Sequence, residues 1–90
     1  MCFADAERWK TLISIHQFKD PNTAGNTLLV ECARSPAICV SDSLGNTYTE
    51  VRVDESHGWL WAAWNCLGGS NIVTVDAPET AEIIIFEVPG

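Results

Sequence analysis

The stretch "SDSLGNTYTEVRVD" (residues 41–54) combines the two signals that decide the fold of this chain, a turn and an alternating run. Leu44-Gly45-Asn46 suits a tight connection, because Gly and Asn tolerate left-handed backbone. Asp42 can brace this turn by accepting hydrogen bonds from nearby backbone amides. From Thr47 onward the residues alternate with a period of two, which is typical of a β-strand. The stretch therefore predicts a turn followed by a strand.

The same period of two recurs along the rest of the chain, with turn residues at a spacing of roughly 8–12 residues. The strands expected from it are 11–18, 27–33, 37–41, 47–54, 58–65, 71–77 and 81–88. This pattern predicts an all-β fold, an antiparallel two-sheet β-sandwich of about seven strands, immunoglobulin-like or jelly-roll-like. We assign residues 1–10 to an N-terminal extension and residues 11–90 to the sandwich domain.

The charge balance restricts the partners that the chain can bind. Five basic residues stand against twelve acidic ones, for a net charge of −7, and the basic residues form no patch. This argues against nucleic acid and against anionic membranes, which require basic stripes. No apolar stretch approaches the roughly 20 residues that span a bilayer, and the first residues do not read as a signal peptide. We expect a cytoplasmic chain or one cut from a longer exported protein.

The cysteines give a weak disulfide framework. Four are present, at Cys2, Cys32, Cys39 and Cys66, which permits two bonds in three pairings. Cys32 and Cys39 flank an expected hairpin and could meet, although strand alternation points Cys39 away from Cys32 unless a bulge intervenes. We favour free, partly buried thiols, because cysteine packs well as a small apolar side chain.

Four blocks of sequence, taken in order, carry a family resemblance: "NTAGNTLLV", "VSDSLGNTYT", "WAAWNCLGGSNIVTV" and "IIIFEVPG". Together they resemble a family of immunoglobulin-like or fibronectin-type β-sandwich domains of large secreted and surface-associated bacterial proteins. The resemblance implies a β-sandwich, an extracellular setting and no catalytic residues. Family members continue past the last block, and the opening "MCFADAER" matches nothing in the family pattern. The chain therefore resembles a truncated member, with at least one unpaired sheet edge that invites association.

The resemblance also implies a structural role for the polar and glycine residues of the blocks. It places them in the loop before a core strand, in the turn block and in a second hairpin around residues 64–71, and gives them no ligand. The turn residues named on this basis are Gly25, Asn26, Asp42, Gly45, Asn46, Gly68 and Gly69.

Three tryptophans in the expected strand 58–65 are the most informative side chains. Trp59 and Trp61 share one face of the strand, and Trp64 falls on the other. Buried tryptophans dominate small cores, which is the plain interpretation for Trp61. Exposed indoles can instead stack on sugar rings, so we name Trp59 and Trp64 as candidate ligand-binding residues.

The sequence predicts no catalytic, metal or cofactor site. Ser41 and Ser43 lack a positioned base and a glycine-framed serine elbow. The two histidines, His16 and His57, do not combine with the cysteines at a zinc-binding spacing. Acidic residues are scattered through the loops without a D-x-D-x-D-G motif, so calcium binding is a minor hypothesis.

Two functional hypotheses remain. The first is a non-catalytic module of a larger secreted or surface protein, with an architectural or adhesive role in protein contact or self-association through an open sheet edge. The second is a carbohydrate-binding module that uses exposed tryptophans to hold a polysaccharide. An enzymatic role ranks below both, because the chain offers no nucleophile, metal motif or phosphate loop.

Overall fold

The computed structural model of the chain describes residues 12–35, 37–54 and 58–90, with the backbone alone for 52–54. The expected N-terminal extension, residues 1–10, lies outside the described residues. The described residues form seven strands and no helix. The strands are β1 (Leu12–Gln17), β2 (Thr27–Ala33), β3 (Cys39–Asp42), β4 (Thr49–Asp54), β5 (Gly58–Ala63), β6 (Ile72–Ala77) and β7 (Glu82–Val88).

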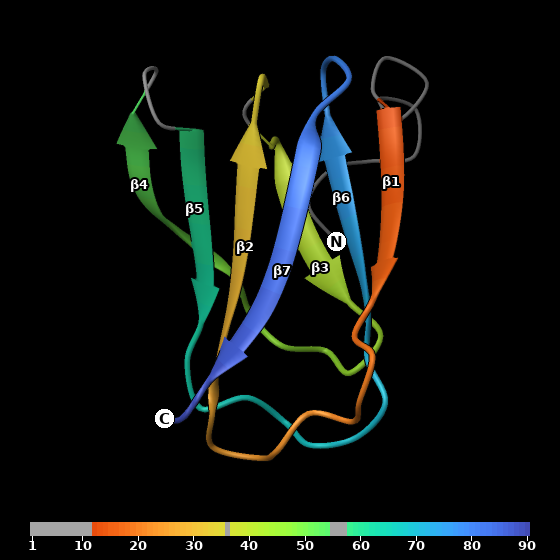
Figure 1. The fold of residues 1–90 in the computed structure, drawn as a ribbon, viewed down its shortest axis with the longest axis vertical. Coiled ribbons are helices and arrows are strands. Elements are labelled where there is room, and N and C mark those ends of the chain that lie inside the picture. Colours follow the sequence, from red (N-terminus) through yellow and green to blue (C-terminus); the bar gives the residue numbers. More distant parts are fainter. Residues whose placement is uncertain (1–11, 36, 55–57) are drawn as a thin grey trace.

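The strands form two antiparallel sheets that pack as a β-sandwich (Figure 1). One sheet has the order β1-β6-β3, and the other has the order β4-β5-β2-β7. The predicted all-β, two-sheet fold class is therefore confirmed. None of the described residues belongs to a helix long and apolar enough to cross a membrane.

Consecutive strands alternate between the two sheets. Among the connections of the described chain, only that from β4 to β5 joins neighbours in one sheet, and the other five cross from one sheet to the other. Two sequence-based expectations are corrected here. The segments around residues 34–38 and 64–71 were expected to be hairpins, but each leads from the four-stranded sheet to the three-stranded one. The turn at 43–48 also crosses between sheets.

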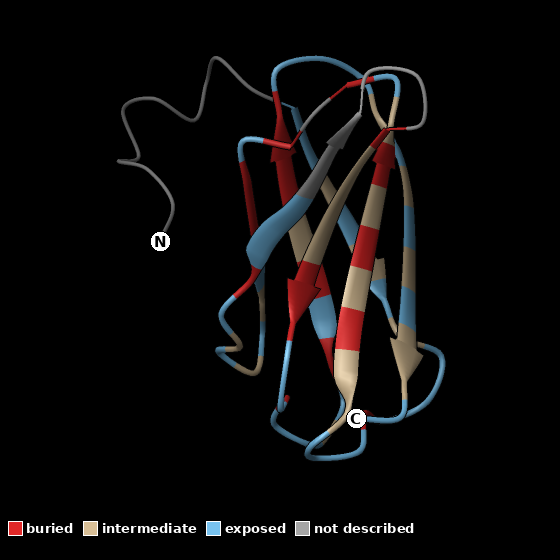
Figure 2. Cartoon of the chain, turned by 90° about the vertical axis from the view of Figure 1, so that its left-hand side faces the viewer, coloured by how far each residue is buried: buried red, intermediate tan, exposed pale blue. Residues whose placement is uncertain are grey.

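The core lies between the sheets and follows from the period of two. Buried and half-buried residues alternate along β2, which shows as red and tan bands in Figure 2. Leu28 and Val30 of β2 face Val73 and Val75 of β6, and all four side chains are fully buried. The side chains of Phe18, Trp59, Trp61, Ile83 and Ile85 are partly buried and pack against this core.

The cysteines behave differently from one another. Cys39 is disulfide-bonded, whereas Cys32 and Cys66 are free and buried. The expectation of free thiols is thus wrong for Cys39, and a bond between Cys32 and Cys39 is excluded because Cys32 is free. The physical reason is alternation: Val40 of β3 belongs to the core cluster, so its neighbour Cys39 lies on the opposite face of the strand, where it is buried, whereas Cys32 belongs to the core.

The first residue of β5 is a glycine that combines a positive φ with a close backbone contact. Gly58 has a φ of +100°, and a Cβ there would lie 2.5 Å from the carbonyl oxygen of Cys32 on β2. Gly58→Ala should lower the free energy of unfolding by about 2–4 kcal/mol, because both the backbone conformation and the strand spacing must change. Urea denaturation measures this effect.

Gly45→Ala is the matched control, because Gly45 has a φ of +86° but open space where a Cβ would lie. Its loss should be about 1 kcal/mol, from the backbone conformation alone. Equal losses in the two variants would contradict the steric account of Gly58.

Candidate functional site

Polar side chains gather at one end of the sandwich, where three sheet-to-sheet connections meet the end of β7 (Figure 1, lower end). The connections are those from β1 to β2, from β3 to β4 and from β5 to β6. The first and third also pair through their backbones: the amide of Asn22 donates to the carbonyl of Gly69 at 2.8 Å, and the amide of Gly69 donates to that of Asn22 at 3.0 Å. This end of the fold is therefore held by contacts between loops that are distant in sequence.

Asp42, the last residue of β3, is the centre of the cluster. Its Oδ1 accepts hydrogen bonds from the amides of Leu44 at 3.1 Å and Asn46 at 2.9 Å, as expected of a turn brace. Its Oδ2 accepts three more, from Asn46 Nδ2 at 2.8 Å, the Tyr48 hydroxyl at 2.7 Å and Asn71 Nδ2 at 2.9 Å. One carboxylate thus ties its own turn to the connection between β5 and β6.

A chain of amide side chains leads from Asp42 to Glu87 on β7. Asn71 Nδ2 also donates to Asn22 Oδ1 at 2.8 Å, and Asn22 Nδ2 donates to Glu87 Oε1 at 2.9 Å. Asn22 and Asn71 are both buried. Because buried amides are costly unless they are paired, each of these bonds satisfies a group that would otherwise destabilise the fold.

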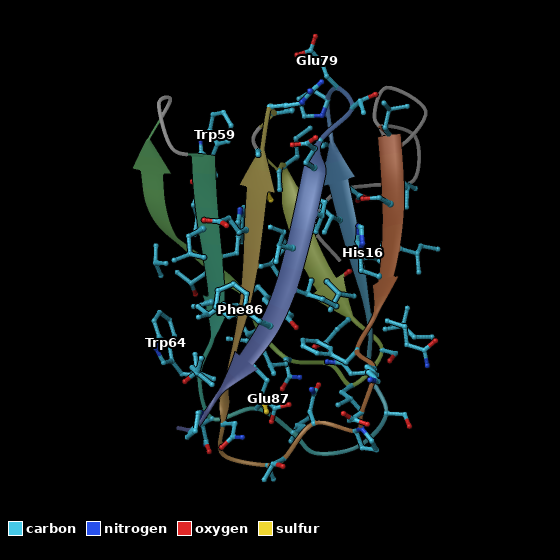
Figure 3. All side chains as sticks on the ribbon, in the orientation of Figure 1. His16, Trp59, Trp64, Glu79, Phe86 and Glu87 are labelled. Carbon is cyan, nitrogen blue, oxygen red and sulfur yellow. The ribbon has the colours of Figure 1, made fainter. Side chains whose placement is uncertain are left out.

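Glu87 closes the cluster from the other sheet (Figure 3). Its Oε2 accepts hydrogen bonds from the amide of Thr23 at 2.9 Å and from Asn26 Nδ2 at 2.8 Å. Asn26 Oδ1 in turn accepts a bond from the amide of Gly90 at 3.2 Å. We call the linked side chains of Asp42, Asn46, Tyr48, Asn71, Asn22, Glu87 and Asn26 the Asp42–Glu87 network.

The glycines of the same loops allow the close approach that the network needs. Gly25, Gly45 and Gly69 have positive φ values of +92°, +86° and +126°. A Cβ on Gly68 would lie 3.1 Å from the amide nitrogen of Ala24, and one on Gly90 would collide with the carbonyl of Gly25. The seven turn residues named from the resemblance therefore all lie in this end of the sandwich, as parts of the network or of the loops that carry it.

The network controls the ionisation of its members. Burial acts to raise the pKa of Asp42, but the hydrogen bonds from Asn46, Asn71 and Tyr48 outweigh it and hold that pKa below its usual value. The amide of Thr23, with the Asn22 and Asn26 side chains, lowers the pKa of Glu87 despite an opposing effect of burial. Burial and the bond to Asp42 raise the pKa of the Tyr48 hydroxyl. Both carboxylates are therefore ionised at neutral pH, and Tyr48 is neutral.

The free thiols of the described residues are not poised as nucleophiles. Burial raises the pKa of Cys32 to about 11 and also raises that of Cys66. The Cys66 thiol donates to the carbonyl of Thr23 at 3.2 Å, which places it in the loop packing around the network. The thiolate is the reactive form of cysteine, and burial disfavours it at both positions.

The histidines and the candidate metal ligands of the sequence do not come together in the described residues. Within the described residues, no three His, Cys, Asp or Glu side chains group closely enough to hold a metal ion. His57 lies outside the described residues. His16 on β1 has its pKa lowered by burial, so its ring is neutral at pH 7.

The two candidate ligand-binding tryptophans lie on different surfaces. Trp59 packs partly buried against the core, whereas Trp64, just after β5, is 59% exposed and stands clear of the strand end in Figure 3. Phe86 of β7 is 38% exposed, and Ile84 of the same strand is 58% exposed. Sequence reasoning had not selected these two side chains, although alternation against Ile83 and Ile85 in "EIIIFEV" could have indicated them.

Comparison with protein-family models, with curated proteins and with solved structures finds no match to this chain. The described residues define the class of the protein by fold alone, as a small antiparallel β-sandwich. The polar groups of its Asp42–Glu87 network hydrogen-bond to one another.

The lowered pKa values of Asp42 and Glu87 predict acid sensitivity. Their contribution to stability is present above the ordinary pKa values of 3.8 and 4.5 and is lost as pH falls through the lower values of the folded chain. Glu87→Gln should lower the free energy of unfolding by about 1–3 kcal/mol at pH 7, because the amide nitrogen of glutamine then faces a donor such as the buried Asn22 side chain. Denaturant unfolding from pH 7 to pH 2.5 measures the loss.

The difference between the original chain and Glu87→Gln should shrink as pH falls, because protonated Glu87 resembles glutamine. Glu79→Gln, at an exposed turn position, serves as the control and should leave stability nearly constant. A Glu87→Gln deficit that is independent of pH would contradict the assignment.

Proposed function

We propose that this chain is a non-catalytic β-sandwich module of a larger secreted or surface protein, and that it makes protein contacts through an open strand edge. The observation that carries the proposal is the free edge of β7, an apolar strand with one neighbour in the described part of the fold. Edge strands present unpaired backbone groups, which pair readily with extended segments of other chains.

The four edge strands differ in how well they are protected. β3 has only four residues, and β4 carries alternating charges and a register shift between Glu50 and Arg52. Short strands, charges and bulges all discourage edge pairing. β7 contains three consecutive isoleucines and a phenylalanine, with no lysine, proline or bulge in its pairing to β2. It is therefore better suited to contact than β3 or β4.

A structural role for the polar cluster supports a module without catalysis. The Asp42 and Glu87 carboxylates accept hydrogen bonds from neighbouring loops. The residues that carry the resemblance to the bacterial family therefore hold the connections together. The same resemblance supports the secreted or surface setting. The disulfide at Cys39 supports it as well, because such bonds persist in oxidising compartments.

Sedimentation velocity and panning of a peptide library displayed on phage test this function. The domain should form concentration-dependent oligomers or enrich peptides of extended, alternating sequence. Ile84→Lys should reduce either behaviour at least about fivefold, because an edge lysine disfavours strand addition.

Ile72→Lys is the matched control, because Ile72 is also exposed but lies on the central strand β6. It should bind like the original chain. A folded domain that stays monomeric at all concentrations and enriches no peptide would refute the proposed contact function.

Carbohydrate binding is the second candidate, and the exposure of Trp64 favours it. An indole that is 59% exposed presents a face on which a sugar ring can stack, and Phe86 adds a second exposed ring on the same sheet. Trp59 contributes packing instead.

Trp64→Ala should then weaken polysaccharide binding about tenfold or more with little change in melting temperature, whereas Trp59→Ala should lower stability by about 2–4 kcal/mol. Tryptophan fluorescence during titration with a panel of soluble polysaccharides measures both effects. Absence of a saturable shift with every polysaccharide, in folded protein, would exclude this second function.

A further inference from the structure

The sheet that ends at β7 is laterally offset from the sheet that ends at β1. In the face-on view of Figure 1, β1 lies beyond the free edge of β7. A strand added at that edge would extend the four-stranded sheet over β6 and toward β1. The inner face of β1 is therefore a part of the sandwich that the side chains of such a strand would approach.

The inner face of β1 is incompletely buried. Phe18 packs against the core, and alternation places Leu12, Ser14 and His16 on the same side of the chain. Leu12 is nevertheless 52% exposed, although it faces the other sheet. Figure 3 shows His16 on the β7 side of β1.

Two hollows lie beside β1, one toward each of its ends, and the first of them is also lined by β7. The first, of about 420 Å³, is lined by Phe18, Lys19 and Asp20 together with Ile85 and Glu87 of β7. The second, of about 300 Å³, is lined by Leu12, Ile13 and Ser14 at the start of β1, by Ala77 at the end of β6 and by the turn at 79–81 that leads into β7. We call this strip of surface, from Leu12 to Phe18 along β1 and from Ala81 to Glu87 along β7, the β1–β7 groove.

We propose that the β1–β7 groove binds an extended segment of a partner protein, which pairs with β7 as a fifth strand and places alternate side chains on β1. This inference rests on the proposed contact function and specifies its site. Pairing with β7 satisfies the free backbone groups of the edge, and every second side chain of the segment enters the hollows beside Leu12 and Phe18. The apolar side chains among the lining, Phe18 and Ile85 in one hollow and Leu12 in the other, favour branched or small apolar residues at those positions.

The charges of the groove specify the flanks of the segment. Asp20 and Glu87 line one hollow and Glu79 the other, with Lys19 as the basic residue among the lining side chains. The whole chain carries a net charge of −7. A segment with lysine or arginine at its ends complements this field, whereas a second copy of the chain would bring the same negative charge and the acidic flanks of its own β7. The partner is therefore a basic-flanked, alternating apolar segment of another protein.

The probe is the labelled synthetic peptide Lys-Thr-Ile-Thr-Val-Thr-Val-Thr-Lys, with binding followed by fluorescence anisotropy. Two control peptides carry glutamate in place of both lysines, or the same residues with the apolar ones adjacent. The original chain should bind the first peptide at least about tenfold more tightly than either control, and added salt should weaken that binding.

Leu12→Lys and Ile15→Lys form the matched pair of variants. Both residues are exposed on β1, at 52% and 68%, and both substitutions add one positive charge, but Ile15 lies on the face that points away from the groove. Leu12→Lys should weaken peptide binding at least about tenfold, and Ile15→Lys should stay within about twofold of the original chain. Urea unfolding of each variant verifies that both remain folded.

The remaining possible results of these experiments would each overturn the groove as the binding site. Equal effects of the two β1 variants, or no binding of the alternating peptide, would overturn the groove as the site. If binding is lost in Ile84→Lys but kept in Leu12→Lys, the contact function stands and the groove does not. Concentration-dependent self-association without peptide binding would assign the β7 edge to a second copy and would also overturn the inference.

Discussion

One oxygen atom, Oδ2 of Asp42, receives hydrogen bonds from three side chains, and the arrangement of the loops depends on it. The strands alternate between two sheets, so three of the sheet-to-sheet connections converge at one end of the sandwich. Such loops have no ladder to satisfy their polar groups. The Asp42–Glu87 network supplies that satisfaction, with one carboxylate at the end of β3 and the other on β7, in opposite sheets. The stability of the loops at this end therefore depends on a few charge-assisted hydrogen bonds.

This arrangement suits a chain of ninety residues, whose core is thin. The largest fully buried side chains are one leucine, three valines, an asparagine, a cysteine and a serine, while the tryptophans are only partly covered. The lateral offset of the sheets explains this limited burial, since β1 extends past β7. The same offset of the sheets leaves part of β1 exposed beside the free edge of β7. The proposed contact function uses both the exposed surface and the edge.

The sequence predicts the strands well and their partners poorly. Alternation locates all seven strands, because a strand with one buried face imposes a period of two on its own residues. The segment 64–71 reads as a hairpin because Gly and Asn serve tight turns and sheet-to-sheet connections alike. The hydrogen bonds of Asn22 and Asn71 to partners 65 and 29 residues away have no local signature. Trp59 and Trp64 separate correctly by face, but their degree of burial depends on how the sheets are offset. The disulfide of Cys39 likewise reflects tertiary packing, since it lies on the outward side of β3.

The position of Glu87 in the sequence has a consequence for biosynthesis. Asn22 and Asn26 lie 65 and 61 residues before the carboxylate that accepts their hydrogen bonds. A nascent chain emerging from the ribosome can form the pairing of β1 with β6 and of β2 with β5 before β7 is available. It cannot satisfy those two amides until β7 has been synthesised and has added to β2. Formation of the Asp42–Glu87 network is therefore coupled to the arrival of β7, and a ribosome-bound intermediate exposes the edge of β2 until that moment.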